Sequence, residues 1–159
     1  MVIDGKASLS IKSLTNSASD VTAVLGLDPT ASAEIGDPVG RVRTGADGKP
    51  SMRERTHSIW ALDAEHIDSD DRSGFAGVRA LVALLESRKS ALKKLRDRYF
   101  LEIRWSGFSD SPQGGFLLPS DLLIALGSLG LDFHGTVYLT EDRAEVEAAE
   151  SAEGLAQSD

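Results

Sequence analysis

The sequence predicts an α+β fold, an antiparallel sheet with helices on one face, and two kinds of pattern favour it. Three segments, 7–11, 101–105 and 133–139, alternate apolar and polar residues as half-buried strands do, and 58–62 is a fourth β-like run. A helix-like phrase occurs twice, at residues 19–26 (SDVTAVLG) and 120–127 (SDLLIALG), each time between two such segments. The repetition indicates a duplicated β-α-β, which fits a ferredoxin-like plait with an inserted helix. A simple open sheet fits the same pattern.

The first strand and the first helix are predicted in the opening 26 residues. Residues 7–11 (ASLSI) alternate apolar side chains with serines, so we expect a strand there. The helix should begin at Ser19 and Asp20, whose side chains can accept free N–H groups of the first turn. Gly26 provides the stop.

Residues 30–56 predict a long loop, because they are rich in glycine and proline and poor in large apolar residues. Loops of this length are usually functional or mobile. Four arginines, Arg41, Arg43, Arg53 and Arg55, could together form an anion-facing surface that contacts a partner. The alternative is a loop that its charges merely keep soluble.

The remaining elements follow from the same periodicities. We expect strands at 58–62, 101–105 and 133–139, and a long amphipathic helix at 75–95. Residues 107–115 are rich in glycine and serine and predict the tip of a hairpin.

The aromatic residues divide into two groups. Trp60 and Trp105 stand in alternating strands among apolar neighbours, so we expect both to be buried. Phe108 and Phe116 flank the glycine-rich tip and are candidate contact residues for a partner protein. The alternative is that both rings fold under the loop into the core.

Length and composition indicate one domain. The chain has 159 residues, of which 41% are hydrophobic, and we expect a single α+β domain at 1–140 and a disordered acidic tail at 141–159. The absence of cysteine excludes disulfides and thiolate chemistry. No apolar run approaches the length of a membrane span, and no secretory signal precedes the domain, so we expect a cytoplasmic protein with no membrane association.

The charge of the chain is unevenly distributed. The net charge is −8, and the tail alone carries seven acids against one arginine. Nucleic acid is therefore an unlikely partner. A basic run at 88–98 is interpreted as the positively charged end of the long helix, where cations favour the helix dipole.

The richest cluster of metal-ligand side chains contains Glu65, His66, Asp68 and Asp70. Carboxylate oxygens suit a hard divalent cation, but this stretch lacks the glycine and the closing glutamate of a calcium loop. These residues are weak metal candidates. The preferred interpretation is a solvated connector before the long helix, with no metal and no cofactor.

The sequence does not support an enzyme. Its three histidines lie in or beside strands and connectors, and no Gly-x-Ser-x-Gly elbow accompanies them. The glycine-rich segments lack the lysine of a phosphate loop and the spacing of a dinucleotide motif. We therefore predict no catalytic residues.

Several segments resemble a family of bacterial and phage proteins known as domain of unknown function 4279. They are residues 7–11, 21–30 (VTAVLGLDPT), 36–38 (GDP), 57–60 (HSIW) and 115–138. The resemblance implies a shared fold but brings no activity, cofactor or catalytic residue. It also implies an interaction role in bacterial or phage conflict.

The function expected from the sequence is that of a small cytoplasmic protein-interaction module. It would act as an inhibitor or immunity-type protein, and the net charge would suit inhibition of a basic toxin or defence enzyme. The alternative is a small anionic-ligand sensor or enzyme that uses residues 30–56 as a lid.

Overall fold

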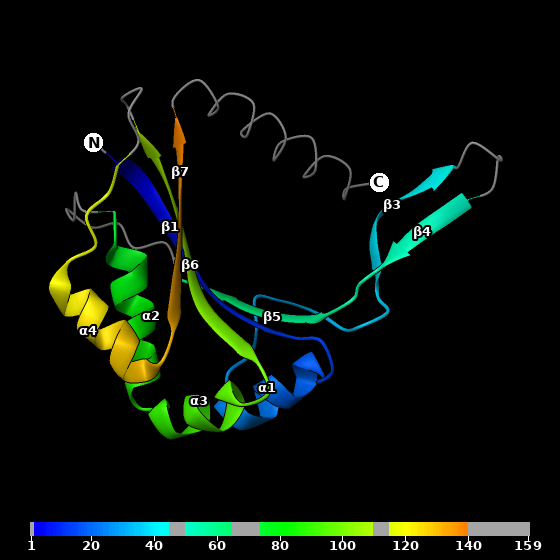
Figure 1. Ribbon diagram of the computed structural model, residues 1–159, viewed down its shortest axis with the longest axis horizontal. Helices are drawn as coiled ribbons and strands as arrows, with labels where there is room; N and C mark the ends of the chain where they lie inside the picture. The colour runs from blue at the N-terminus through cyan, green and yellow to red at the C-terminus, as the bar shows by residue number, and fades with distance from the viewer. Residues whose placement is uncertain (1, 45–49, 65–73, 110–114, 140–159) are drawn as a thin grey trace.

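The computed structural model describes residues 2–44, 50–64, 74–109 and 115–139 (Figure 1). A five-stranded sheet has the order β2-β5-β1-β6-β7, and a separate two-stranded sheet pairs β3 with β4. The strands are β1 (Val2–Ser13), β2 (Ala31–Ala33), β3 (Pro38–Thr44), β4 (Pro50–Glu54), β5 (Ser58–Asp63), β6 (Phe100–Ser109) and β7 (Asp132–Leu139). The helices are α1 (Ala18–Leu25), α2 (Ala76–Glu86), α3 (Lys89–Arg96) and α4 (Ser120–Leu129).

The α+β class is confirmed, but the sheet is mixed rather than wholly antiparallel. β1 lies at its centre and runs antiparallel to both β5 and β6, whereas β6 and β7 are parallel. β2 also runs antiparallel to β5, so β1 and β2, on either side of α1, are parallel to each other but separated by β5. β6 and β7, on either side of α4, are parallel and adjacent. Two split β-α-β units, β1-α1-β2 around β5 and β5-α2-α3-β6 around β1, interlock as in a ferredoxin-like plait. The second unit contains α2 and α3 rather than the repeated phrase, because the second copy of that phrase forms α4 and leads to the additional parallel strand β7.

Both phrases form helices, but their predicted ends are only partly correct. The N-cap of α1 is Ser17, whose side chain accepts a hydrogen bond from the Ser19 amide, and Gly26 closes the helix at a φ of 65°. In α4, no side chain caps the first turn, and Gly127 lies inside the helix rather than ending it. Gly130 is its left-handed C-cap, at a φ of 68°.

The long helix predicted at 75–95 is two helices, α2 and α3, separated at Ser87 and Arg88. The Arg88 side chain fixes this break, because it donates to the carbonyl of Leu84 in α2 and to that of Leu25 at the end of α1. The change of direction lets α2 pack on β1 while α3 packs on α1.

The core lies between the sheet and these helices. Trp60 and Trp105 are buried as predicted, and each indole N–H has an acceptor: Thr22 Oγ1 at 2.9 Å for Trp60 and the Gly74 carbonyl at 2.7 Å for Trp105. A buried Trp N–H usually has such a partner, so both rings are fully accommodated. Alternate residues of the two central strands complete the layer: Ala7, Leu9, Ile11, Leu101 and Ile103.

The segment predicted as a long loop contains three strands. β2 joins the edge of the large sheet beside β5, and β3 and β4 form an arm that projects away from it (Figure 1). The middle of the predicted hairpin tip, residues 110–114, and the acidic tail, 141–159, lie outside the described residues. Within the described part of the chain, no helix is long and apolar enough to cross a membrane.

Candidate functional site

The two faces of the large sheet differ in their cover. The described helices all lie on one side, and the other side, here called the open face, carries none of them (Figure 1). Strand register places on this open face Ser8, Ser10, Lys12, Glu102, Arg104, Ser106, Phe108, Asp132, His134, Thr136 and Tyr138. Most of these side chains are polar, so the face is suited to contact with water or with another polar surface.

Glu102 is the centre of a charged cluster on the open face. Lys12 Nζ lies 2.6 Å from Glu102 Oε1, while Arg104 Nε and His134 Nδ1 each lie 4.0 Å from a Glu102 oxygen. The Glu102 side chain is 22% exposed, whereas those of Arg104 and His134 are 55% and 57% exposed. The carboxylate therefore lies beside the Lys12 ammonium, with the Arg104 guanidinium and the His134 ring close by, and these side chains still face solvent. Such groups can pair with a partner without first losing a buried contact.

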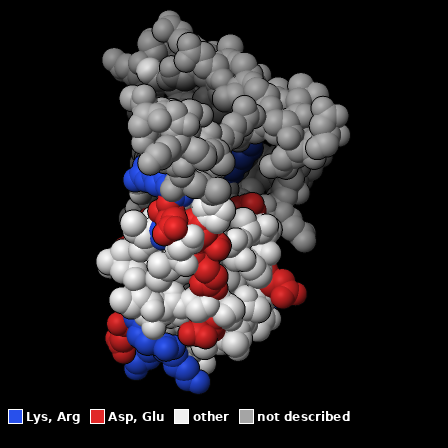
Figure 2. All heavy atoms as spheres, turned by 90° about the vertical axis from the view of Figure 1, so that its right-hand side faces the viewer, with Lys and Arg blue, Asp and Glu red and all other residues white. Residues whose placement is uncertain are grey.

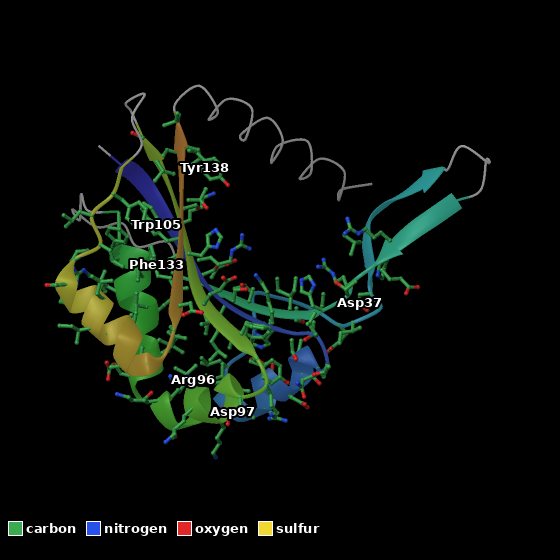
Figure 3. All side chains as sticks on the ribbon, in the orientation of Figure 1. Asp37, Arg96, Asp97, Trp105, Phe133 and Tyr138 are labelled. Carbon is green, nitrogen blue, oxygen red and sulfur yellow. The ribbon has the colours of Figure 1, made fainter. Side chains whose placement is uncertain are left out.

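The two candidate phenylalanines lie on opposite faces. Phe108 is half-buried on the open face, with its ring centre 5.4 Å from that of Tyr138. Phe116 lies on the helix side, with its ring centre 5.0 Å from that of Trp105, and remains 42% exposed. Figure 3 shows Trp105 on the helix side and Tyr138 on the other. The pair therefore does not form one contact patch.

The β3–β4 arm is attached to the body through Glu34 and Asp37. The Asp37 carboxylate accepts from the Glu34 amide at 2.6 Å, and the Asp37 carbonyl accepts from the Arg55 amide at 2.8 Å. The Arg55 carbonyl in turn accepts from Gly36 at 2.9 Å. These bonds join the two ends of the arm at its base, where Figure 3 labels Asp37.

The Glu34 side chain links this base to α1. Its carboxylate accepts from the Ser17 hydroxyl at 2.6 Å and from the amides of Ala18 and Ser19 at 3.0 and 3.1 Å. These are the free N–H groups of a helix N-terminus, where negative charge is favoured. The hydrogen bond from Ser17, with smaller contributions from the two amides, lowers the pKa of Glu34. The base of the arm is thus anchored to α1 by charge-assisted hydrogen bonds.

The four candidate arginines belong to this arm and its base. Arg41 and Arg43 are in β3, with side chains outside the described ones, and Arg53 is exposed in β4. Arg55 follows β4, and its Nε is buried without a hydrogen-bond partner among the described residues. The backbone therefore brings together four arginines that the sequence spreads over fifteen positions.

The basic run at 88–98 spans the separate helix α3 rather than the end of one long helix, and two of its arginines contact other helices. Arg96 donates to the carbonyl of Leu129 at the end of α4 at 3.0 Å, and Arg88 serves the ends of α1 and α2 in the same way. Arginines at helix C-termini satisfy carbonyls that have no partner within the helix. Figure 2 shows Lys and Arg gathered at the end of the molecule where α3 lies.

The metal candidates Glu65, His66, Asp68 and Asp70 lie outside the described residues. Elsewhere in the described chain, no group of three or more His, Cys, Asp or Glu residues could hold a metal ion. His57 has Thr56 Oγ1 at 3.3 Å from its Nδ1, and His134 faces Glu102, so the two described histidines belong to different local settings.

A helix-backed sheet with an open polar face and a projecting arm defines a small α+β domain. The chain belongs to the family described as Domain of unknown function (DUF4279), whose model matches residues 3–140. Comparison with curated proteins and with solved structures gave no match.

Proposed function

We propose that this chain is a protein-interaction module whose β3–β4 arm, together with the open face, receives a partner protein. The observation that carries the proposal is the arm itself. Its strands pair with each other and with no described strand of the large sheet. A segment whose strands form a sheet of their own yet is held in place at its base is well suited to contact another molecule.

Charge indicates the kind of surface that the arm would contact. Residues 38–55 contain five basic and two acidic residues, in a chain whose net charge is −8. A local excess of positive charge on a negative protein steers a partner that presents acidic side chains. We therefore expect an acidic patch on the partner. An inhibitor or immunity-type role in bacterial or phage conflict is the biological form that we favour for this interaction.

The alternative is a sensor or enzyme that uses residues 30–56 as a lid over an anionic ligand. A lid has to lie over the site that it closes. The arm instead projects beyond the edge of the large sheet (Figure 1), and its two ends are joined by hydrogen bonds at the base. This arrangement supports a contact arm more than a lid.

The experiment is affinity capture from host lysate with two charge-reversal variants of equal net charge. One variant carries Arg43→Glu and Arg53→Glu on the arm, and the control carries Lys93→Glu and Lys94→Glu on α3, where both lysines are exposed. We expect the wild-type chain and the control to capture the same protein, and the arm variant to bind it at least about tenfold more weakly.

Two outcomes would contradict the proposal. Equal binding of the partner by the arm variant and the control would remove the arm from the interface. If the wild-type chain captured no stoichiometric protein but bound a small anion, the sensor alternative would take precedence. Circular dichroism of all three proteins checks that the substitutions leave the fold intact.

A further inference from the structure

Strand β7 forms one edge of the large sheet. It pairs with β6 along its length, from Asp132 to Leu139, and no described strand pairs with its other side. Exposed edges promote association with another strand, and proteins usually protect them with lysine or proline. β7 contains neither of these residues. An edge of eight residues without such protection is a ready site for a further strand.

Helix α4 carries exposed apolar side chains. Leu123 is 55% exposed and Ile124 is 72% exposed, and Leu117, just before the helix, is 81% exposed. Leu122, Leu126 and Leu129 on the same helix are buried, so α4 is apolar on more than its core-facing side. A helix of this kind usually has a partner on its outer side.

The outer side of α4 faces away from the centre of the sheet. Asp121 forms an ion pair with Arg79 of α2, and α2 packs on the central strand β1. Successive residues are about 100° apart around a helix, so Leu123 lies on the side opposite Asp121. Because α4 also contacts β7, Leu123 is on the side of α4 toward the free edge.

Gly127 is one turn along the same side of α4 as Leu123. Glycine inside a helix costs about 1 kcal/mol relative to alanine, so its presence suggests a packing reason. A Cβ at Gly127 would meet nothing within 4 Å. Its position is thus an open notch on the surface beside Leu123, where the backbone of α4 can be approached closely.

We propose that two copies of this chain associate through β7 to form one continuous ten-stranded sheet, with their α4 helices packed against each other. A two-fold axis perpendicular to the sheet makes the two β7 strands antiparallel and keeps both α4 helices on the same face. Those helices are then antiparallel too, and their exposed apolar sides, which carry Leu123, face each other. A second copy supplies both missing partners, a strand for the edge and an apolar helix beside it.

The sequence of β7 is compatible with pairing to itself. In a register centred on Thr136, His134 faces Tyr138 and Phe133 faces Leu139 of the other copy. Apolar residues then meet on the helix side, and no like charges are directly opposite within the described strand, which would be unfavourable. The arms, on the far side of β5 from β7, are left free, so this inference does not depend on the proposed function.

The first test is the mass of the full chain in solution over a concentration series, by analytical ultracentrifugation. We expect a species of twice the 16.9 kDa chain mass. Leu123→Glu should raise its dissociation constant at least about tenfold, whereas Leu84→Glu, at an exposed leucine of α2, should not. A wild-type chain that stays monomeric throughout overturns the proposal and leaves the edge to a strand from another protein.

A cysteine cross-link tests the register directly, because the chain has no cysteine of its own. Thr136→Cys should form a disulfide dimer under mild oxidation, since residues at the centre of an antiparallel pair have Cα atoms about 4.5–5.5 Å apart. Ser106→Cys is the matched control, because Ser106 is the β6 neighbour of Thr136 and lies one strand further from the axis. Cross-linking of both variants to the same extent, or of Ser106→Cys alone, would exclude this register.

Discussion

The two faces of the large sheet differ in burial: the same strands carry buried apolar side chains on the helix side and exposed polar side chains on the open face. In β6, Trp105 is 2% exposed and contacts the ring of Phe75, whereas its neighbour Arg104 has a side chain that is 55% exposed. One residue along the strand thus separates the core from the solvent. The comparison shows that stability is concentrated on the helix side, where apolar burial dominates. The open face can change its side chains at little cost to the fold.

The largest loss of stability is expected when a buried tryptophan on the helix side is truncated. Trp105→Ala should lower the free energy of unfolding by about 3–5 kcal/mol, because it removes a buried ring and leaves a cavity. Arg104→Ala, at the adjacent position on the other face, should change it by no more than about 0.5 kcal/mol. Urea denaturation of both variants measures the difference. Similar losses for the two would mean that the open face also carries part of the folding energy.

Removing the charge of Glu34, which anchors the arm to α1, should lower the free energy of unfolding by an intermediate amount. Glu34→Gln should cost about 1 kcal/mol at neutral pH, the usual contribution of a side chain that caps a helix. The pKa of Glu34 is lowered, chiefly by the Ser17 hydrogen bond, so the charged form stabilises the fold above the ordinary value of 4.5. That stability is lost as the pH falls through the lowered pKa.

The measurement is a series of melting curves from neutral to acid pH for the wild type and Glu34→Gln. The gap between the two curves should be widest at neutral pH and should close at the acid end. A gap that stays constant with pH would mean that the Glu34 charge has no part in the anchor.

The smallest effect is expected for the charged cluster of the open face. Lys12→Met removes the 2.6 Å pair with Glu102, but both side chains are partly exposed, so the loss should be about 0–1 kcal/mol. The difference from wild type should shrink further in high salt, which screens exposed charges. A loss above about 2 kcal/mol would place Glu102 among the residues on which folding depends. Denaturant titrations at low and high salt separate these cases.

The strands could be predicted from the sequence because alternation records which residues face a core. The period of two at 7–11 and 101–105 gave both the strands and the buried position of Trp105. Alternation says nothing about the partner of a strand. The pairing of β6 with β7 in parallel, and of β1 with β5 antiparallel, therefore had no signal in the periodicity.

The sequence contains a weak indication that the long helix is divided, but the apolar stripe that runs through both halves makes it easy to miss. Leu85 and Leu92 are two turns apart, and a core-facing residue is expected between them, near position 88 or 89. Arg88 and Lys89 occupy those positions, and Arg88 uses its guanidinium for the carbonyls of two helices. A charged interruption of the stripe thus marks the break, but only the contact with α1 explains it.

The candidate site was predicted only in part. The arginines of residues 41–55 were recognised as a charged group, but the strands beneath them were not, because glycine and proline suggested a loop. Phe108 and Phe116 were grouped by their closeness in sequence, whereas the structure separates them by face. Lys12, Glu34 and Glu102 were missed, since their importance depends on contacts with residues at least 15 positions away.

The pairing of β2 with β5 has a consequence for how this domain can vary. Ala33 is the register partner of Ile59, so the chain leaves and re-enters the large sheet at neighbouring positions. The segment between those positions, which includes the whole arm, therefore leaves the sheet and returns to it at the same edge. A segment of this kind can be shortened, lengthened or exchanged without moving β2 and β5, which flank it. The arm is therefore a replaceable unit. Substitutions in it, or grafting of another arm, could change what the domain contacts while its core stays the same.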